Sequence, residues 1–553
     1  RPNDTEIRTG AHTPLTVEAD GETYLSVHQV NLDDYALASL APTSDGGGTQ
    51  FETQLAPLPD NTKVSWELPN ATPWRTIQVG SSPDDLRESS LVPLLNEELD
   101  TDALPSTGGK PDTDWLTPRK YVGIWWTMIA GNANWEYRDD AGPDYIHGAR
   151  TERMQRYMHF AANNGIESVL AEGWNRGWDT YPGNGTGLEM GVEESYPDFD
   201  VPAVTDYGAG LDESVEMTMH NETAGNIVNY ETEILDDDIF AGYESEGIRS
   251  IKNGYVSNPG LGFEGNGARA THTQHSQLAV THNRRVIAEA ASERQWLEIH
   301  EGIVPTGERR TYPNVGAREV VKAQEYDGFG ALGSSVGRDH HVTLPYTRML
   351  AGPTSFQPGI FDLDFSDDTG DRVQTTLAKQ LAMYPSYNAG IQMAADRIEA
   401  YVDEGFGIGE YVQAASGDLA GGFITADNWQ NAFGTNYVPL DPNRVPSGAS
   451  ASFTVRGVET AGTYTLHFRY ASAPEENAGR VVDNGNPEFT LTVDGTTQTV
   501  SPAFTDYWDD WAVYSVDVDL EAGDNTVTFG LEYDDSGETF EGYVGGLNLN
   551  TVG

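Results

Sequence analysis

Residues 1–112 alternate apolar and polar side chains at the period of a β-strand. The segments 14–18, 24–28 and 63–68 carry this alternation, and Gly, Asp and Pro residues separate them as turns do. A Pro-, Gly- and Asp-rich linker follows at 101–114. We therefore predict an N-terminal β-sandwich over residues 1–112.

Residues 113–405 change to short apolar runs that alternate with amphipathic segments. This rhythm is typical of a (β/α)8 TIM barrel, in which each parallel strand is followed by a helix. We predict such a barrel over residues 113–405, closed by 373–383 and 389–402. The runs that predict strands are 121–126, 168–172, 216–220, 249–252, 296–300 and 342–346, and the segments that predict helices are 151–164, 229–247 and 277–294.

Residues 406–553 return to the alternation of β-strands. The runs 451–455, 463–470, 489–493, 512–518 and 525–529 are separated by turn residues such as Asp494-Gly495. This spacing predicts a second, C-terminal β-sandwich over residues 406–553.

Ionisable side chains follow several of the predicted barrel strands. They are Glu172, His220, Glu222, Lys252, His300 and Glu301, and the loop after Glu301 leads to Glu319 and Glu325. One such residue is as well explained by a solvated strand end. Four strand ends with this chemistry favour a functional site, because the C-terminal ends of parallel barrel strands meet at one mouth.

Paired carboxylates at a barrel mouth suit the cleavage of a glycosidic bond. One protonated acid serves the leaving oxygen, and one carboxylate activates water or attacks carbon. Trp125, Trp126, Trp174 and Trp178 lie near the predicted strand ends and offer rings on which sugars stack, although barrel core is the alternative for each of them.

Several carboxylates that lie close together require a positive charge among them. Calcium suits such a site, because it takes about six to eight oxygen ligands in irregular geometry. Zinc is a poorer candidate, since His220 and His300 lack a metalloprotease spacing and the chain has no cysteine.

The charge of the chain is strongly negative. Asp and Glu number 86 against 32 Lys and Arg, which gives a formal net charge of -54. Phosphates would be repelled, so a nucleic-acid partner is excluded. Diffuse acidity with scarce lysine is typical of proteins from extreme halophiles, whose carboxylate surface is screened by molar salt. No apolar run reaches the roughly 18 residues of a membrane span.

A series of motifs resembles glycoside hydrolase family 97, over about residues 14–396. The resemblance implies a β-super-sandwich before a (β/α)8 barrel, calcium dependence, and exo-acting hydrolysis of α-glucosides or α-galactosides. Only residues 1–112 precede the predicted barrel, so we expect upstream residues to be missing or the first domain to be reduced. The motifs are 120–126 (Lys-Tyr-Val-Gly-Ile-Trp-Trp), 160–166, 172–175 (Glu-Gly-Trp-Asn), 220–223 (His-Asn-Glu-Thr), 251–256 (Ile-Lys-Asn-Gly-Tyr-Val), 310–314 and 350–353.

Within that family the chain resembles the inverting branch. The resemblance implies that Glu222 and Glu301 act as bases and that Glu325 is the general acid. The retaining branch carries an aspartate nucleophile near the segment that here reads 251–255, where no Asp occurs. Inversion predicts about 6.5–9.5 Å between the acid and base carboxyl groups, which leaves room for a water.

The resemblance also implies metal ligands and sugar contacts. Calcium ligands match Gln29, Glu301, Glu319 and Glu325; the family has Glu where this chain has Gln29, so one negative charge is lost and the affinity for calcium should fall. His220, Lys252 and Glu172 match contacts to sugar hydroxyls, and Trp126 matches a stacking wall.

A second, weaker resemblance concerns residues 410–553, which are similar to carbohydrate-binding modules of family 6 or 35. Trp429, Tyr437, Tyr507, Trp508 and Trp511 would form its sugar platform, and its acidic loops would hold a structural calcium.

Together these patterns predict a calcium-dependent, inverting α-glucosidase that acts on oligosaccharides or polysaccharides. The alternatives are an α-galactosidase of the same family and a non-catalytic carbohydrate-binding protein. The absence of cysteine, the acidity and a polysaccharide substrate favour secretion.

Overall fold

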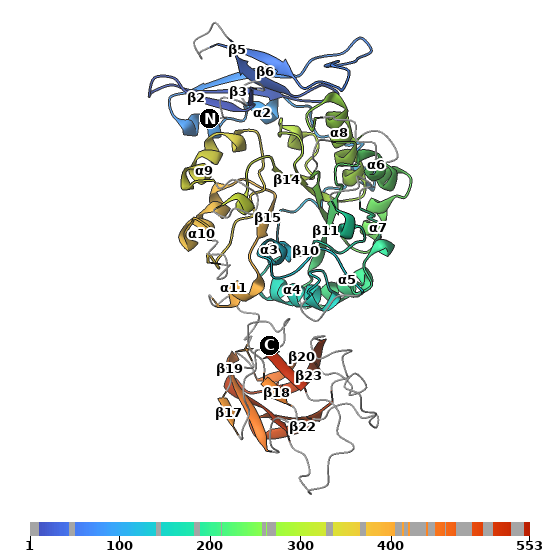
Figure 1. Ribbon diagram of the computed structural model, residues 1–553, viewed down its shortest axis with the longest axis vertical. Coiled ribbons are helices and arrows are strands. Elements are labelled where there is room, and N and C mark those ends of the chain that lie inside the picture. The colour runs from blue at the N-terminus through green and yellow to red at the C-terminus, as the bar shows by residue number, and fades with distance from the viewer. Residues whose placement is uncertain are drawn as a thin grey trace. The chain divides into compact units, whose positions relative to one another are not determined.

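The computed structural model describes most of the chain (Figure 1). The described residues are 10–43, 50–139, 145–181, 188–211, 213–256, 261–262, 273–327, 336–364, 372–403, 412–413, 418–420, 438–440, 448–458, 461–471, 489–501, 512–531 and 547–552. The chain divides into two compact units, of which the first is residues 1–138 with 147–397 and the second is 139–146 with 398–553.

Two small antiparallel sheets form the N-terminal part of the first unit. One has the order β1-β4-β5 and the other β2-β3-β6. The predicted strands at 14–18 and 24–28 are confirmed as β2 and β3. The strands are β1 (Ala11–His12), β2 (Leu15–Glu18), β3 (Tyr24–Val30), β4 (Ala38–Pro42), β5 (Phe51–Leu55) and β6 (Trp74–Gly80).

The prediction of a strand at 63–68 is wrong. The backbone of Ser65 is bonded by a side chain instead of a neighbouring strand: its N–H donates to Gln277 Oε1 (2.8 Å), and Gln277 Nε2 donates back to its carbonyl (3.0 Å). Trp66 Nε1 donates to the carbonyl of Asp34. Side-chain partners thus satisfy a segment whose alternating pattern resembled that of a strand.

Seven parallel strands form a nearly closed barrel, with the order β14-β13-β12-β11-β10-β9-β15. The predicted fold class, a TIM-like barrel with flanking β-sheets, agrees with this architecture. The strands are β9 (Arg119–Gly123), β10 (Ser168–Ala171), β11 (Glu216–Glu222), β12 (Ser250–Gly254), β13 (Trp296–His300), β14 (Val315–Glu319) and β15 (Ile391–Ala394).

A segment without regular secondary structure, 353–358, lies between β14 and β15. Arg318 N donates to the carbonyl of Pro353 (3.2 Å), and Ser355 N donates to that of Arg318 (3.0 Å). On the other side, Ala395 N donates to the carbonyl of Pro358 (3.1 Å). The segment therefore bridges β14 and the end of β15 by backbone hydrogen bonds, without forming a strand of the sheet.

Helices surround this barrel in Figure 1. The prediction at 151–164 is confirmed by α4, and that at 277–294 by α8. The helices of the first unit are α1 (Pro83–Arg87), α2 (Leu91–Leu94), α3 (Trp125–Ile129), α4 (Thr151–Asn163), α5 (Val201–Ala209), α6 (Ile227–Leu235), α7 (Ile239–Ser245), α8 (Gln277–Ser292), α9 (Arg338–Thr343) and α10 (Leu377–Ser386).

Two predictions for the barrel were wrong in detail. The single helix expected at 229–247 is split into α6 and α7, because Asp236, Asp237 and Asp238 place negative charge at the C-terminus of α6, where the helix dipole disfavours it. The run 342–346 is no strand: it joins the end of α9 to a 3-10 turn, Leu344–Tyr346, with Pro345 in its first positions and Val342 exposed.

The second unit is a β-sandwich, as predicted. One sheet has the order β16-β25-β20-β23 with β18 on β25, and the other β17-β19-β24-β21-β22. Phe453, Phe468, Leu491, Val527 and Phe529 fill the space between them. The predicted platform residues Trp429, Tyr437, Tyr507, Trp508 and Trp511 lie outside the described residues, so carbohydrate binding by this unit stays a prediction. The strands are β16 (Val412–Gln413), β17 (Asp418–Ala420), β18 (Val438–Leu440), β19 (Ala449–Val458), β20 (Gly462–Ala471), β21 (Phe489–Val493), β22 (Thr496–Val500), β23 (Ala512–Leu520), β24 (Gly523–Leu531) and β25 (Leu547–Val552).

A membrane-spanning helix is absent from the part of the chain that the structure describes, where every helix is too short or too polar to cross a bilayer.

Candidate active site

Five adjacent strands, β10 to β14, bring the predicted polar residues to one end of the barrel. Their parallel pairing places His220 beside Lys252 and His300 beside Glu319. Glu172 directly follows β10, Glu222 ends β11, and Glu301 directly follows β13. Because the carboxyl ends of parallel strands meet at one mouth, the sequence-based grouping of these side chains is reproduced.

A buried ion pair lies on one side of this mouth. Lys252 Nζ donates to Glu172 Oε1 (2.5 Å), and Trp135 Nε1 donates to Glu172 Oε2 (3.3 Å). Burial alone would raise the pKa of Glu172, but His220 and Lys252 lower it to about 2. Burial lowers the pKa of His220 to about 4, so Lys252 supplies the permanent positive charge. Glu172 is therefore an ionised carboxylate that accepts hydrogen bonds from Lys252 and Trp135. Such a cluster of acceptors and donors is suited to binding sugar hydroxyls.

Glu222 and Glu301, the two predicted bases, are neighbouring carboxylates. Glu222 Oε1 accepts from Ala224 N (2.8 Å), and Glu301 Oε2 accepts from Tyr255 N (3.1 Å). Burial, and next the charge of Glu301, raise the pKa of Glu222. A Cβ at Gly254 would lie 2.1 Å from Glu222 Oε2, so only glycine lets this carboxylate pack against the end of β12. Glu301 itself has a φ of 47°, a strained conformation of the kind found at functional sites.

His300 lies between two carboxylates. Its Nδ1 is 3.3 Å from Glu319 Oε2, and its Nε2 is 3.2 Å from Glu298 Oε1. Burial opposes a charge on this ring, but Glu319 and Glu298 raise the pKa of His300 to about 10, so the ring is cationic at neutral pH. With its amide oriented by these neighbours, Gln357 accepts from His300 Nε2 (3.1 Å) and donates to Glu319 Oε1 (3.3 Å).

Glu325, the predicted acid, lies on a 3-10 turn (η4, Gln324–Tyr326) beyond the end of β14. Its Oε2 is buried and has no hydrogen-bond partner among the described residues. Burial, and next the charge of Glu319, raise the pKa of Glu325 to about 8. The carboxyl group is therefore mainly protonated at neutral pH, which is the state of a proton donor.

These carboxylates fit a bound cation. One ligand atom each of His300, Glu301 and Glu319 lies within 4.8 Å of the others, and the two glutamates are the members that could bind a cation, because a protonated imidazole has no free lone pair. The unpartnered Glu325 Oε2 and the raised pKa of Glu301, which results from burial and Glu319, both indicate a site with more negative charge than its neighbours compensate. Carboxylate oxygens are the ligands that calcium prefers.

Gln29, the predicted ligand from the N-terminal domain, is buried on β3. Its Nε2 donates to the carbonyl of Ala36 (3.2 Å), and its Oε1 accepts from Ala38 N (2.6 Å). An amide oxygen has a second lone pair that could reach a metal. Its role as a ligand stays a prediction.

Trp126 does not fit its predicted role as a stacking wall. The side chain is 0% exposed and packs with Tyr121, Leu170 and Ile391 in the barrel core. The strand β9 ends at Gly123 and α3 begins at Trp125, so Trp126 lies in the first turn of a helix and its ring packs in the core. Trp135 and Trp178 are better placed: their rings stack at 6.1 Å, and Trp178 stacks on His220 at 5.8 Å.

Sequence reasoning missed four residues of this site: Trp135, Glu298, Ser355 and Gln357. Glu298 could have been found, because it stands two residues before His300 on a strand and so shares its face. Ser355 and Gln357 had no signal, since 353–358 lacks the apolar pattern of a strand.

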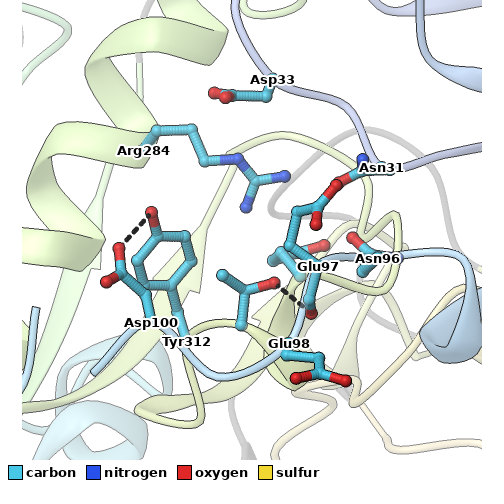
Figure 2. A pocket seen from close by; sticks show the side chains of 10 residues that line it. Asn31, Asp33, Asn96, Glu97, Glu98, Asp100, Arg284 and Tyr312 are labelled. Atoms are coloured by element: carbon cyan, nitrogen blue, oxygen red, sulfur yellow. Dashed lines mark hydrogen bonds between the residues drawn. The ribbon is translucent and has the colours of Figure 1, made fainter. Parts of the chain in front are cut away.

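A cavity of about 260 Å³ lies elsewhere, between the N-terminal domain and the barrel (Figure 2). None of the predicted site residues lines it. Arg284 points into it, but its Nε already donates to the carbonyl of Leu32 (3.0 Å). Asp33, Glu97 and Glu98 on its rim are exposed, and solvated carboxylates of this kind are common on so acidic a protein.

The barrel mouth therefore combines a buried carboxyl group on a turn, a pair of neighbouring carboxyl groups at two strand ends, and a buried Glu172–Lys252 pair with His220 beside it. A pair of carboxyl groups, one acting as acid and one as base or nucleophile, is the usual set of groups for glycosidic bond hydrolysis.

Comparison with known proteins agrees with this chemistry. A family model described as Glycoside hydrolase 97 matches residues 125–321, and one described as Glycosyl-hydrolase 97 N-terminal matches residues 2–97. Among solved structures, a glycoside hydrolase family 97 enzyme from Pseudoalteromonas sp. strain K8 in complex with acarbose is 29% identical with a TM-score of 0.62. That match covers 94% of this chain and 75% of the other.

Two curated relatives carry a different activity in their names. A retaining alpha-galactosidase from Bacteroides thetaiotaomicron is 22% identical over 416 residues, 71% of this chain and 54% of that protein. A probable retaining alpha-galactosidase from Streptomyces bingchenggensis is 21% identical over 336 residues, 60% of this chain and 42% of that protein. The chain thus spans about half the length of the curated relatives it matches.

Proposed function

This chain belongs to glycoside hydrolase family 97, and from its site we propose that it hydrolyses α-glucosidic bonds at the non-reducing ends of oligosaccharides with inversion. The observation that carries this proposal is the placement of three buried carboxyl groups at one barrel mouth. Glu325, whose pKa is raised to about 8 by burial and Glu319, lies on the turn beyond β14, while Glu222 and Glu301 form a separate pair at the ends of β11 and β13.

In this proposal Glu325 donates its proton to the glycosidic oxygen as the bond breaks. Glu222 and Glu301 accept the proton of the attacking water on the opposite face of the sugar. The Glu172–Lys252 pair and His220 bind hydroxyl groups and so hold the ring in place; the pair is fixed at 2.5 Å before substrate arrives. Such preorganised polar groups lower the cost of orienting the substrate.

Calcium would be held by Glu301, Glu319 and Glu325, with Gln29 as a weaker candidate. When bound, the ion would neutralise this carboxylate cluster and stabilise negative charge that develops beside it.

The choice of substrate and stereochemistry rests on two observations. The 29% identical relative is bound to acarbose, a mimic of an α-linked glucose oligosaccharide, which favours a glucoside. In β12 the residue is Asn253, whose Nδ2 donates to Tyr255 Oη (3.2 Å), in the segment where the retaining branch carries an aspartate nucleophile. The curated names favour a retaining α-galactosidase instead, and this is the second candidate.

Product stereochemistry separates these candidates. We expect maltose, incubated with the enzyme in molar salt with calcium, to release β-glucose first, as proton NMR would detect before mutarotation. α-Galactose appearing first from 4-nitrophenyl α-galactoside would support the retaining branch. If neither substrate releases a sugar, the result would favour the third hypothesis, a non-catalytic carbohydrate-binding protein.

Exhaustive chelation before the same assay tests the calcium site. Without the ion, the carboxylates of Glu301 and Glu319 repel each other, so we expect turnover of maltose to be lost and the thermal midpoint to fall. Added calcium should restore both. Full turnover after chelation would rule out calcium at this site.

A further inference from the structure

We propose that a buried contact between Asp327 and His341 positions Glu325 for proton donation. The inference rests on the proposed function, in which Glu325 is the general acid. Neither residue carries a sequence-based role, and neither belongs to the strand ends described above.

Asp327 closes the turn that carries Glu325. Its N–H donates to the carbonyl of Gln324 (3.0 Å), which ends the 3-10 turn η4. The Asp327 side chain is 0% exposed, and its Oδ2 lies 3.0 Å from Nε2 of His341 on α9. The turn that carries Glu325 thus lies against α9 through a buried polar contact two residues after the acid.

The residue on the other side of Glu325 is held as well. Gln324 N donates to the carbonyl of Phe356 (3.2 Å), and Gln380 Nε2 donates to Gln324 Oε1 (3.2 Å). In contrast, Glu325 Oε2 has no partner among the described residues. The placement of the acid therefore depends on the anchored residues before and after it.

His341 is itself held rigidly. Tyr387 Oη donates to its carbonyl (2.9 Å), and its ring meets the edge of Phe356 at 5.4 Å and 81°. Phe356 and Tyr387 belong to a compact apolar cluster with Ala323 and Leu344. A turn tied to this cluster keeps one position, whereas a turn held by solvated groups would sample several.

Fold stability alone is a poor explanation for the pair. Burying two polar side chains costs their hydration, and replacing both partners of such a contact by apolar groups of the same shape can be nearly neutral for stability. A pair that fixes geometry is better explained by a need for accurate placement, since displacing a catalytic group by about 1 Å can cost about 100-fold in rate.

The test uses two substrates that differ in their need for an acid. Maltose has a poor leaving group, whereas 4-nitrophenol leaves readily without protonation. In the full chain with calcium, we expect D327N and H341Q each to lower kcat for maltose about 10- to 100-fold with KM nearly unchanged, while kcat for 4-nitrophenyl α-glucoside falls less than about threefold.

A matched control is E216Q. Glu216 pairs with Arg119 at the opposite, N-terminal end of the barrel strands, so its loss should change stability without changing the ratio of the two kcat values. Circular dichroism and thermal midpoints establish that each variant is folded. If D327N does not fold, H341Q provides the same comparison.

A double variant separates positioning from general damage. If Asp327 acts through Glu325, D327N adds little to the loss for maltose in an E325Q background, whereas an unrelated structural role would add its full effect. Equal losses on both substrates, or full additivity, would overturn the inference. If E325Q itself shows no dependence on the leaving group, the proposed function fails and the positioning role fails with it.

Discussion

Replacing Glu325 with Gln is expected to lower kcat for maltose by about 100- to 10,000-fold, the usual contribution of a general acid. The amide keeps the shape of the side chain but has no acidic proton to donate to the leaving glucose. Burial and Glu319 raise the pKa of Glu325 to about 8, so the native group carries that proton at neutral pH. For 4-nitrophenyl α-glucoside, whose leaving group needs no proton, we expect a much smaller loss.

Steady-state kinetics on both substrates provide the measurement, and E233Q is the matched control. Glu233 is also a buried glutamate whose pKa is raised, to about 7, chiefly by burial. It lies on α6 and accepts from Met190 N (2.7 Å), away from the strand ends. The same chemical change there should leave both kcat values near those of the native protein. Equal losses for both substrates in E325Q would remove Glu325 from the role of acid.

Much of this site could be predicted because ionisable residues recur at the ends of successive predicted strands. Glu172, His220, Glu222, Lys252 and His300 each follow or end an apolar run, and parallel pairing brings such positions to one mouth without further information. The local sequence pattern was sufficient to locate these residues, because the strands that carry them are short and apolar and are bounded by clear helical segments.

The rest depended on contacts that no local pattern encodes. β14 was missed because its Val-Gly-Ala-Arg-Glu sequence contains Arg318, a charged residue that is buried with its Nε donating to Glu308 Oε1 (2.8 Å) and its Nη2 to Asn283 Oδ1 (2.8 Å). The segment 353–358 is held between β14 and β15 by backbone hydrogen bonds to Arg318 and Ala395, which its own composition does not predict. Trp126 was misplaced because the sequence does not tell whether an aromatic residue after a strand faces the mouth or the core.

The second large effect expected is on stability, from replacing Lys252 with Met. Lys252 and Glu172 are both almost fully buried and lie 2.5 Å apart, so the substitution leaves an unpaired carboxylate in the barrel. Removing one partner of a buried pair typically costs about 3–5 kcal/mol of unfolding free energy. Urea unfolding followed by tryptophan fluorescence at pH 7 measures this loss.

Two further variants control for the loss of a lysine. K120M removes a surface lysine whose Nζ is 3.9 Å from Glu167, and such exposed pairs contribute only about 0–1 kcal/mol. The double variant with E172Q and K252M removes both charges, so it should recover much of the stability that K252M loses. A double variant less stable than K252M would show that the lysine acts by packing and not by charge.

The effect of K252M should also depend on pH, because Glu172 is the group left unpaired. In the native protein, burial opposes ionisation of Glu172, but His220 and Lys252 lower its pKa to about 2 from an ordinary 4.5. A carboxylate with a depressed folded pKa stabilises the fold above its unfolded pKa and loses this contribution as pH falls through the folded value.

Without Lys252, burial dominates and Glu172 takes up a proton at higher pH, which removes its buried charge. The difference in unfolding free energy between native protein and K252M should therefore be largest near pH 7 and shrink as pH falls towards about 2, the folded pKa of Glu172 in the native protein. A difference that stays constant over this range would mean that the charge of Glu172 is not what Lys252 compensates.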